Sequence, residues 1–205
     1  GIELDGQIAA ANAQDMPEEA QDVVLYGFGR IGRLLARNYI ERSGPAALLN
    51  LRAVVCRPSK DPAADLRKRA SLLRTDSIHG AFNATVEVDE DRLCLIANGN
   101  RIQFIYAPDP AGLNYGEYGI KNAILIDNTG VWKDDAGLGQ HLASSGVEKV
   151  LLTAPAKGDI PNIVYGVNDG EIAGQSIISA ASCTTNAATP VLKVLDKTYG
   201  IEQGH

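Results

Sequence analysis

The feature that most constrains the fold is a glycine-rich turn that begins at Gly27. The apolar run Val23–Tyr26 predicts a short buried strand ending at this turn. The six residues that follow, GFGRIG, have the spacing G-x-G-x-x-G, and residues 31–42 continue with the apolar periodicity of an amphipathic helix. A second apolar run at 51–56 predicts another strand. Strand, helix and strand in this order require parallel strands joined by a right-handed crossover.

Each glycine of the turn has a physical role in this context. Gly27 permits the tight turn, Gly29 lets a pyrophosphate approach the backbone, and Gly32 allows helix and strand to pack closely. The amides at the start of the helix then face the phosphates. Because a strand precedes the motif and a helix follows it, the turn predicts dinucleotide binding rather than a merely structural turn.

Similar patterns along the chain predict the remaining elements. Further strands are expected at 84–88, 93–96, 102–106, 123–127, 147–153, 162–167 and 176–180, and further helices at 61–73, 134–145 and 183–199. The short turns between 84 and 106 indicate antiparallel pairing there. The sequence thus predicts an α/β fold: a Rossmann-type, doubly wound, mostly parallel sheet with a small antiparallel insertion.

Composition excludes several kinds of partner. The chain has 205 residues, with 19 Lys and Arg against 25 Asp and Glu, so its net charge is −6. An acidic chain without a basic run argues against nucleic acid or an anionic membrane surface as partner. No run approaches the roughly 20 apolar residues of a membrane helix. Three widely spaced cysteines exclude a simple disulfide framework and a C-x-x-C metal site, and predict a reduced, cytoplasmic location without a metal.

The end of the second strand bears on which dinucleotide binds. NAD-binding domains place an Asp or Glu there to hold the ribose hydroxyls. Here the strand is followed by Arg57 and Lys60, with no acid before Asp61. Cations at this place favour the 2′-phosphate of NADP, or use of both NADP and NAD. The alternative is that Arg57 simply points into solvent.

A second candidate site is Cys183, between small and hydroxylated residues at a predicted strand-to-helix junction. A helix N-terminus stabilises a thiolate. Thiolate attack on a carbonyl gives a hemithioacetal, and the amides of the same turn could hold its oxyanion. Cys56 and Cys94 lie in or beside strands, where a buried, inert cysteine is expected.

Several motifs together resemble the family of phosphorylating glyceraldehyde-3-phosphate dehydrogenases. They are GFGRIGR at 27–33, DSIHG at 76–80, NTGVW at 128–132, YGVN at 165–168 and SCTTN at 182–186. The resemblance runs from about residue 23 to 205, and the residues before Val23 resemble the N-terminal extension of a longer bacterial form. It implies an NAD(P)-dependent oxidoreductase of glycolysis and gluconeogenesis, usually a homotetramer.

The resemblance also implies residue roles. Arg30 and Ile31 would lie on the cofactor pyrophosphate, and Thr129 on the nicotinamide side of the cleft. Ser182, Cys183 and Thr184 would hold a phosphorylated aldehyde, with Cys183 as the nucleophile. Hydride would pass to the nicotinamide, and inorganic phosphate would release the acyl group as a 1,3-bisphosphoglycerate.

Three positions depart from the family pattern. The ribose-binding Asp is absent, an adenine-side Arg is replaced by Pro108, and a second cysteine four residues after the nucleophile is replaced by Ala187. The first two concern cofactor binding. The third removes an oxidation partner and leaves catalysis unaffected.

The motifs divide the chain into three parts: a helical N-terminal extension (1–22), an NAD(P)-binding domain (23–181) and the start of a catalytic domain (182–205). In the family the catalytic base is a histidine in a T-V-H segment placed just beyond Gly204. His79 is expected to be a structural, hydrogen-bonded residue, and His141 a surface residue on a polar helix. We therefore expect a cofactor-binding fragment without efficient turnover.

Two other interpretations stay open. Erythrose-4-phosphate dehydrogenase shares both the glycine and the cysteine motif. A free-standing, non-catalytic nucleotide-binding module, with Cys183 as a redox-sensitive thiol, is also compatible with the sequence.

Overall fold

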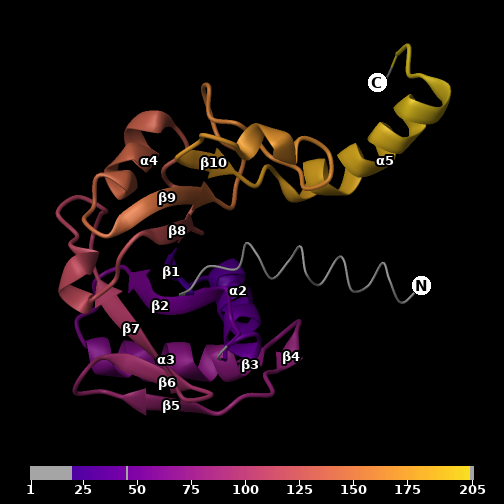
Figure 1. Cartoon of the computed structure of the whole chain (residues 1–205). Helices are drawn as coiled ribbons and strands as arrows, with labels where there is room; N and C mark the ends of the chain where they lie inside the picture. The colour runs from indigo at the N-terminus through magenta and orange to yellow at the C-terminus, as the bar shows by residue number, and fades with distance from the viewer. Residues whose placement is uncertain (1–19, 45, 204–205) are drawn as a thin grey trace.

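The structure is a computed structural model that describes residues 20–44 and 46–203, and its centre is one large sheet (Figure 1). The strands of the sheet are β1 (Gln21–Tyr26), β2 (Leu49–Cys56), β5 (Val86–Asp89), β6 (Cys94–Ala97), β7 (Asn100–Tyr106), β8 (Ala123–Asp127), β9 (Val147–Leu152) and β10 (Ile177–Ser179). The helices are α2 (Arg30–Glu41), α3 (Pro62–Arg74), α4 (Asp135–Leu142) and α5 (Cys183–Tyr199), with short 3-10 turns η1 (Tyr115–Tyr118) and η2 (Asp169–Ile172). A separate hairpin pairs β3 (Thr75–Asp76) with β4 (Gly80–Ala81).

The strand order confirms the predicted fold class. The eight strands lie in the order β10-β9-β8-β1-β2-β7-β6-β5. The six strands from β10 to β7 pair in parallel. The strand β6 pairs antiparallel with both of its neighbours, β7 and β5. Because β2 lies on one side of β1 and β8 on the other, the connections leave β1 in opposite directions. This is the topological switch point of a doubly wound sheet, where ligands bind.

Two hydrophobic cores cover the two faces of the sheet. Along β1, Val23 and Leu25 point to the face covered by α2 and α3, whereas Val24 and Tyr26 point to the face covered by α4 and η1. This alternation is what the period of two in a strand requires when both faces are buried.

One predicted strand is wrong. Residues 162–167 form turns, and only an isolated bridge joins Asn162 to Ser179. Gly166 has a φ of 76°, and the carbonyl of Val164 accepts hydrogen bonds from the amides of Val167 and Asn168. Ile163 and Val164 are buried here by a loop that folds back on itself, without a ladder of strand hydrogen bonds.

The first strand begins at Gln21, two residues before the predicted domain boundary at Val23. Of the extension predicted to be helical over 1–22, residues 1–19 lie outside the described residues, and Gln21 and Asp22 belong to β1. In the described ranges no helix is long and apolar enough to cross a membrane.

Two glycines set the closest approach between β1 and α2. Gly27 has a φ of 92°, a conformation that favours glycine. A Cβ atom on Gly32 would lie 2.3 Å from the carbonyl oxygen of Gly27. The helix therefore rests directly on the backbone of the turn, as predicted for the third glycine of the motif.

Replacing Gly32 by Ala is expected to lower the free energy of unfolding by about 1–3 kcal/mol, because the added methyl group forces α2 away from the turn. Urea unfolding followed by circular dichroism measures this. Gly29→Ala is the matched control, since a Cβ there meets no atom within 4 Å. Equal stability of the two variants would contradict the packing role of Gly32.

Candidate functional site: a cleft at the switch point

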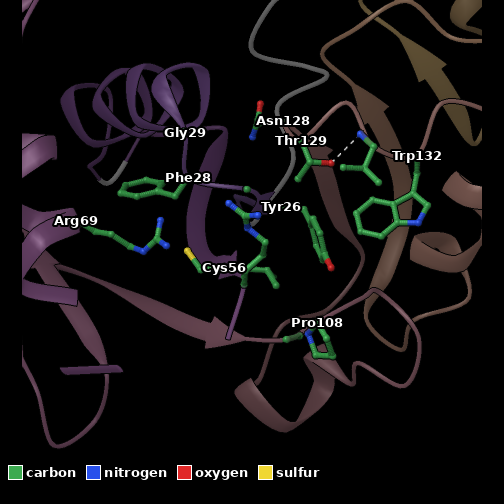
Figure 2. A pocket seen from close by; sticks show the side chains of 14 residues that line it. Tyr26, Phe28, Gly29, Cys56, Arg69, Pro108, Asn128, Thr129 and Trp132 are labelled. Atoms are coloured by element: carbon green, nitrogen blue, oxygen red, sulfur yellow. Dashed lines mark hydrogen bonds between the residues drawn. The ribbon is translucent and has the colours of Figure 1, made fainter. Parts of the chain in front are cut away.

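A cleft of about 620 Å³ opens at the carboxyl ends of the central strands (Figure 2). We refer to it as the switch-point cleft. Its lining residues come from four strand ends and from α3: Tyr26, Gly27, Phe28 and Gly29 after β1; Val55, Cys56 and Arg57 at β2; Ala107 and Pro108 after β7; Asn128, Thr129, Val131 and Trp132 after β8; and Arg69 of α3. Its position and size are those of a small-molecule or cofactor site.

The turn from β1 into α2 suits an anionic ligand. Gly29 is the N-cap of α2 and forms no side-chain cap, and the first turn of the helix contains no acidic residue. A Cβ on Gly29 would point into open space. The first amides of the helix, including those of the exposed residues Arg30 and Ile31, are thus accessible where a pyrophosphate is attracted.

The DSIHG motif holds this end of α2 in place. The Asp76 carboxylate accepts hydrogen bonds from the amides of Ile78 and His79 at 3.0 and 3.1 Å, and lies 3.0 Å from His79 Nδ1 and 3.2 Å from Arg33 Nη2. These contacts, led by the Ile78 amide, hold the pKa of Asp76 well below its usual range. His79 is therefore a hydrogen-bonded structural residue, as predicted.

On the other side of the cleft, a buried carboxylate positions Thr129. Asp127 ends β8 and is fully buried. One of its oxygens accepts hydrogen bonds from the amide and the hydroxyl of Thr129 at 2.6 and 2.7 Å, and the other lies 3.0 Å from His141 Nε2. Thr129 itself is exposed and lines the cleft.

The surface location predicted for His141 is wrong. His141 is fully buried and packs edge-on against Tyr26 and Trp132, with ring centroids 4.5 and 5.5 Å away. Its helix, α4, is polar in composition, but the phase of the helix turns this one residue toward β8. The pair that it forms with Asp127 is the feature that sequence analysis missed.

The β2 end of the cleft is where the sequence predicts cations rather than an acid. Arg57 is exposed and lines the cleft, whereas Lys60 does not. Pro108 also lines the cleft. Burial raises the pKa of the neighbouring Cys56 thiol to about 12, so this cysteine stays protonated at neutral pH.

The cysteine motif forms the start of α5. Ser182 is the N-cap, and its hydroxyl accepts a hydrogen bond from the Thr185 amide at 3.0 Å. The side-chain amide of Asn186 donates hydrogen bonds from Nδ2 to the carbonyls of Ala180 and Ser182, at 2.7 and 2.9 Å. Cys183 is therefore the first helical residue, and it is exposed, whereas Cys56 and Cys94 are buried as predicted.

The predicted site residues fall into two groups. Gly27, Gly29, Arg57 and Thr129 line the switch-point cleft, and Arg30, Ile31 and Gly32 continue from it along α2. Ser182, Cys183 and Thr184 lie outside the lining of the cleft, at the start of a helix that extends from the body of the molecule (Figure 1).

Several cleft residues were not predicted. Tyr26, Val55, Cys56, Arg69 and Ala107 are among them, and Phe28, Asn128, Val131 and Trp132 stood in the sequence analysis only as members of motifs. No cluster of three or more potential metal ligands occurs among the residues that the structure describes.

A doubly wound sheet, a glycine turn, an uncapped helix start and a cleft at the switch point together define a Rossmann-type dinucleotide-binding domain. A family model described as "Glyceraldehyde 3-phosphate dehydrogenase, NAD binding domain" matches residues 21–135. The chain belongs to the glyceraldehyde-3-phosphate dehydrogenase family, a family of oxidoreductases with small-molecule substrates. The predicted NAD(P) cofactor agrees with this match.

Curated relatives point the same way. A "glyceraldehyde-3-phosphate dehydrogenase-like protein" of Pseudomonas aeruginosa (strain UCBPP-PA14) is 59% identical over 188 residues, which are 91% of this chain and 40% of the relative. "Glyceraldehyde-3-phosphate dehydrogenase A, chloroplastic" of Zea mays is 40% identical over 92% of this chain and 44% of its own. "Glyceraldehyde-3-phosphate dehydrogenase" of Bacteroides fragilis (strain YCH46) is 37% identical over 89% and 51%. The chain thus spans about half the length of these relatives or less.

Replacing Asp76 by Asn is expected to destabilise the protein at pH 7 and progressively less at lower pH. A carboxylate whose pKa is lowered by folding contributes stability above its unfolded pKa of about 3.9, and this contribution disappears as the pH falls through the folded value. Unfolding free energies of wild type and Asp76→Asn between pH 7 and pH 3.5 measure the effect. Asp91→Asn, at an exposed position, is the control, and a difference that widens on acidification would contradict the role of Asp76.

Replacing His141 by Phe is expected to lower the unfolding free energy by about 3 kcal/mol, because it removes a partner from the fully buried Asp127 carboxylate. Urea unfolding at pH 7 measures this. Gln140→Ala, at the adjacent exposed position of α4, should change stability by less than about 0.5 kcal/mol. A His141→Phe protein as stable as wild type would show that the pair contributes nothing.

Proposed function

We propose that this chain supplies the cofactor-binding domain and the nucleophile of a phosphorylating glyceraldehyde-3-phosphate dehydrogenase. The observation that carries the proposal is Cys183: it is exposed at the first residue of α5, within SCTTN, in a chain whose fold is that of the family's NAD-binding domain. The residues of the switch-point cleft fit a dinucleotide. We assign its pyrophosphate to the turn at Gly29, Arg30 and Ile31, and its nicotinamide side to Thr129.

In the proposed reaction, the thiolate of Cys183 attacks the aldehyde carbonyl and forms a hemithioacetal. The oxyanion is held by the amides of the first turn of α5, where the helix dipole favours negative charge. Bound NAD(P) supplies the hydride acceptor that converts the hemithioacetal into a thioester. Inorganic phosphate then attacks the acyl carbon, releases an acyl phosphate and returns the Cys183 thiolate.

The surrounding residues support this use of Cys183. Ala181 has a φ of 56°, an unusual value for a residue with a side chain, and Asn186 fixes the carbonyls on both sides of it. Ser182 and Thr184, whose hydroxyl oxygens are 3.0 Å apart, are assigned to substrate binding. Backbone strain next to a reactive residue is common in functional sites.

The base of the reaction is assigned by resemblance to the T-V-H segment beyond Gly204. Among the described residues, His79 and His141 are bonded to Asp76 and Asp127 instead. We therefore propose that these 205 residues bind the cofactor and present a reactive thiol without efficient turnover.

The remaining assignments follow from the family. We propose a phosphorylated aldehyde and inorganic phosphate as substrates, a homotetramer for the protein at the length of its relatives, a cytoplasmic location and a place in glycolysis or gluconeogenesis. Members of the family are typically oligomeric.

In a polypeptide extended to the length of its relatives, Cys183→Ala should reduce cofactor reduction by more than about a thousandfold while leaving dinucleotide affinity unchanged. The absorbance of the reduced cofactor measures its formation in the presence of phosphate. Glyceraldehyde 3-phosphate is the substrate, and erythrose 4-phosphate is tested as the alternative aldehyde. Thr198→Ala, in the last turn of the same helix, is the matched control. Full activity of the Cys183 variant would overturn the proposal.

A further inference from the structure

We propose, building on the function proposed above, that the β2 end of the switch-point cleft is a binding site for the 2′-phosphate of NADP, formed by the guanidinium groups of Arg57 and Arg69. Both residues line the cleft, Arg57 directly after β2 and Arg69 from α3. Arg69 has no counterpart in the motifs of the sequence, and the fold alone brings it to this place.

The carboxylates near this end of the cleft are already engaged. Asp61 caps α3, and its side chain accepts a hydrogen bond from the Ala64 amide at 2.9 Å. Asp65 accepts hydrogen bonds from Arg69 Nε at 2.5 Å and from the Tyr106 hydroxyl at 3.1 Å. Neither acid lines the cleft. Among the described residues that line the cleft there is thus no carboxylate for a ribose diol, although such a group is what favours NAD.

Arg57 is available to a ligand. It is exposed, and it forms no hydrogen bond or ion pair with any residue that the structure describes. An arginine side chain that is free in the absence of ligand loses no internal contact when it binds an anion, and its planar fork matches the oxygens of a phosphate.

Arg69 is held in position rather than free. Its side chain is largely buried, and the bond from Nε to Asp65 fixes one edge of the guanidinium group. The Tyr106 hydroxyl lies 3.1 Å from Asp65 Oδ2 and 3.0 Å from the Pro62 carbonyl oxygen, and its one hydrogen is shared between these two acceptors. Figure 2 shows the guanidinium group reaching toward Cys56 and the interior of the cleft. Its terminal nitrogens form no hydrogen bond within the described part of the chain, so their donors remain for a ligand.

The two arginines thus complement each other. Arg69 supplies a guanidinium group that Asp65 holds at the edge of the cleft, and Arg57 supplies an exposed one directly after β2. Two guanidinium groups without an available carboxylate favour a phosphate dianion over a neutral diol. The 2′-phosphate is the only group by which NADP differs from NAD, so the site sets the choice between them.

The sequence contains a single tryptophan, Trp132, and it lines the cleft. Its fluorescence therefore reports binding to the 205-residue chain without any assay of activity. We expect NADP⁺ to bind at least about tenfold more tightly than NAD⁺. We expect 2′,5′-ADP to bind more tightly than 5′-AMP by a similar factor, and isothermal titration calorimetry measures the affinities of these two mononucleotides.

Variants separate the two arginines from general charge effects. Arg57→Ala should weaken NADP⁺ and 2′,5′-ADP by about tenfold or more and leave NAD⁺ within about twofold. Arg69→Met should have the same effects. Arg69→Lys keeps the charge but loses the planar pair of guanidinium donors, so its affinity for NADP⁺ should lie between those of wild type and Arg69→Met. The control is Arg67→Ala, at an exposed arginine of α3 that is paired with Glu90 and does not line the cleft. It should leave all four affinities unchanged.

The outcomes are distinguishable. Equal or tighter binding of NAD⁺, or an Arg57→Ala protein with unchanged NADP⁺ affinity, overturns the 2′-phosphate site and leaves the dehydrogenase function standing. If neither dinucleotide binds to a chain that melts cooperatively, both proposals fail. Should Arg69→Met not fold, a loss of NADP⁺ preference in Arg69→Lys supports the site, and an unchanged preference excludes Arg69 from it.

Discussion

The contact between Gly32 and the carbonyl oxygen of Gly27 is the constraint on which the geometry of the cleft depends. It brings the start of α2 against the end of β1, so that the first amides of the helix face the switch point. Gly27 also allows the approach of the β8 loop, since a Cβ on it would lie 2.8 Å from Thr129 Cγ2. Two segments that are about a hundred residues apart therefore converge on one turn. Side chains at these two positions would separate them and open the site.

The charges around the cleft follow a common rule: the buried or half-buried carboxylates near it are bonded to other residues of the protein. Asp76 is bonded to Arg33 and His79, Asp127 to Thr129 and His141, and Asp65 to Arg69. Burying a carboxylate without partners is costly, so these contacts are needed for folding whatever the ligand is. As a result, the cleft offers backbone amides, hydroxyl groups and guanidinium groups, and this is a surface suited to phosphates.

Elements with a clear local period could be predicted from the sequence, and contacts that depend on helical phase could not. The strand at 123–127 and the helix at 183–199 have the predicted bounds, and the glycine motif located the cofactor turn. His141 was misplaced because its polar neighbours hide the fact that it faces β8. Arg69 lies in a basic stretch of α3, where only the orientation of the helix distinguishes it from Arg67. Within 162–167 the apolar residues Ile163 and Val164 are buried by a loop, and hydropathy alone does not separate this from a strand.

The nucleophile and the cofactor cleft are fixed to the sheet by different means. The hydroxyl of Ser179, at the end of β10, donates to the Ala154 carbonyl at 2.7 Å and accepts from the Ala181 amide at 3.0 Å, which anchors the turn before Cys183. No residue of α5 is buried, so the position of Cys183 depends on this turn and on Asn186 rather than on packing of the helix. The β2 end of the cleft depends instead on α3 and Asp65. Because the two regions share no side chain, cofactor choice can change without altering the geometry of the thiol.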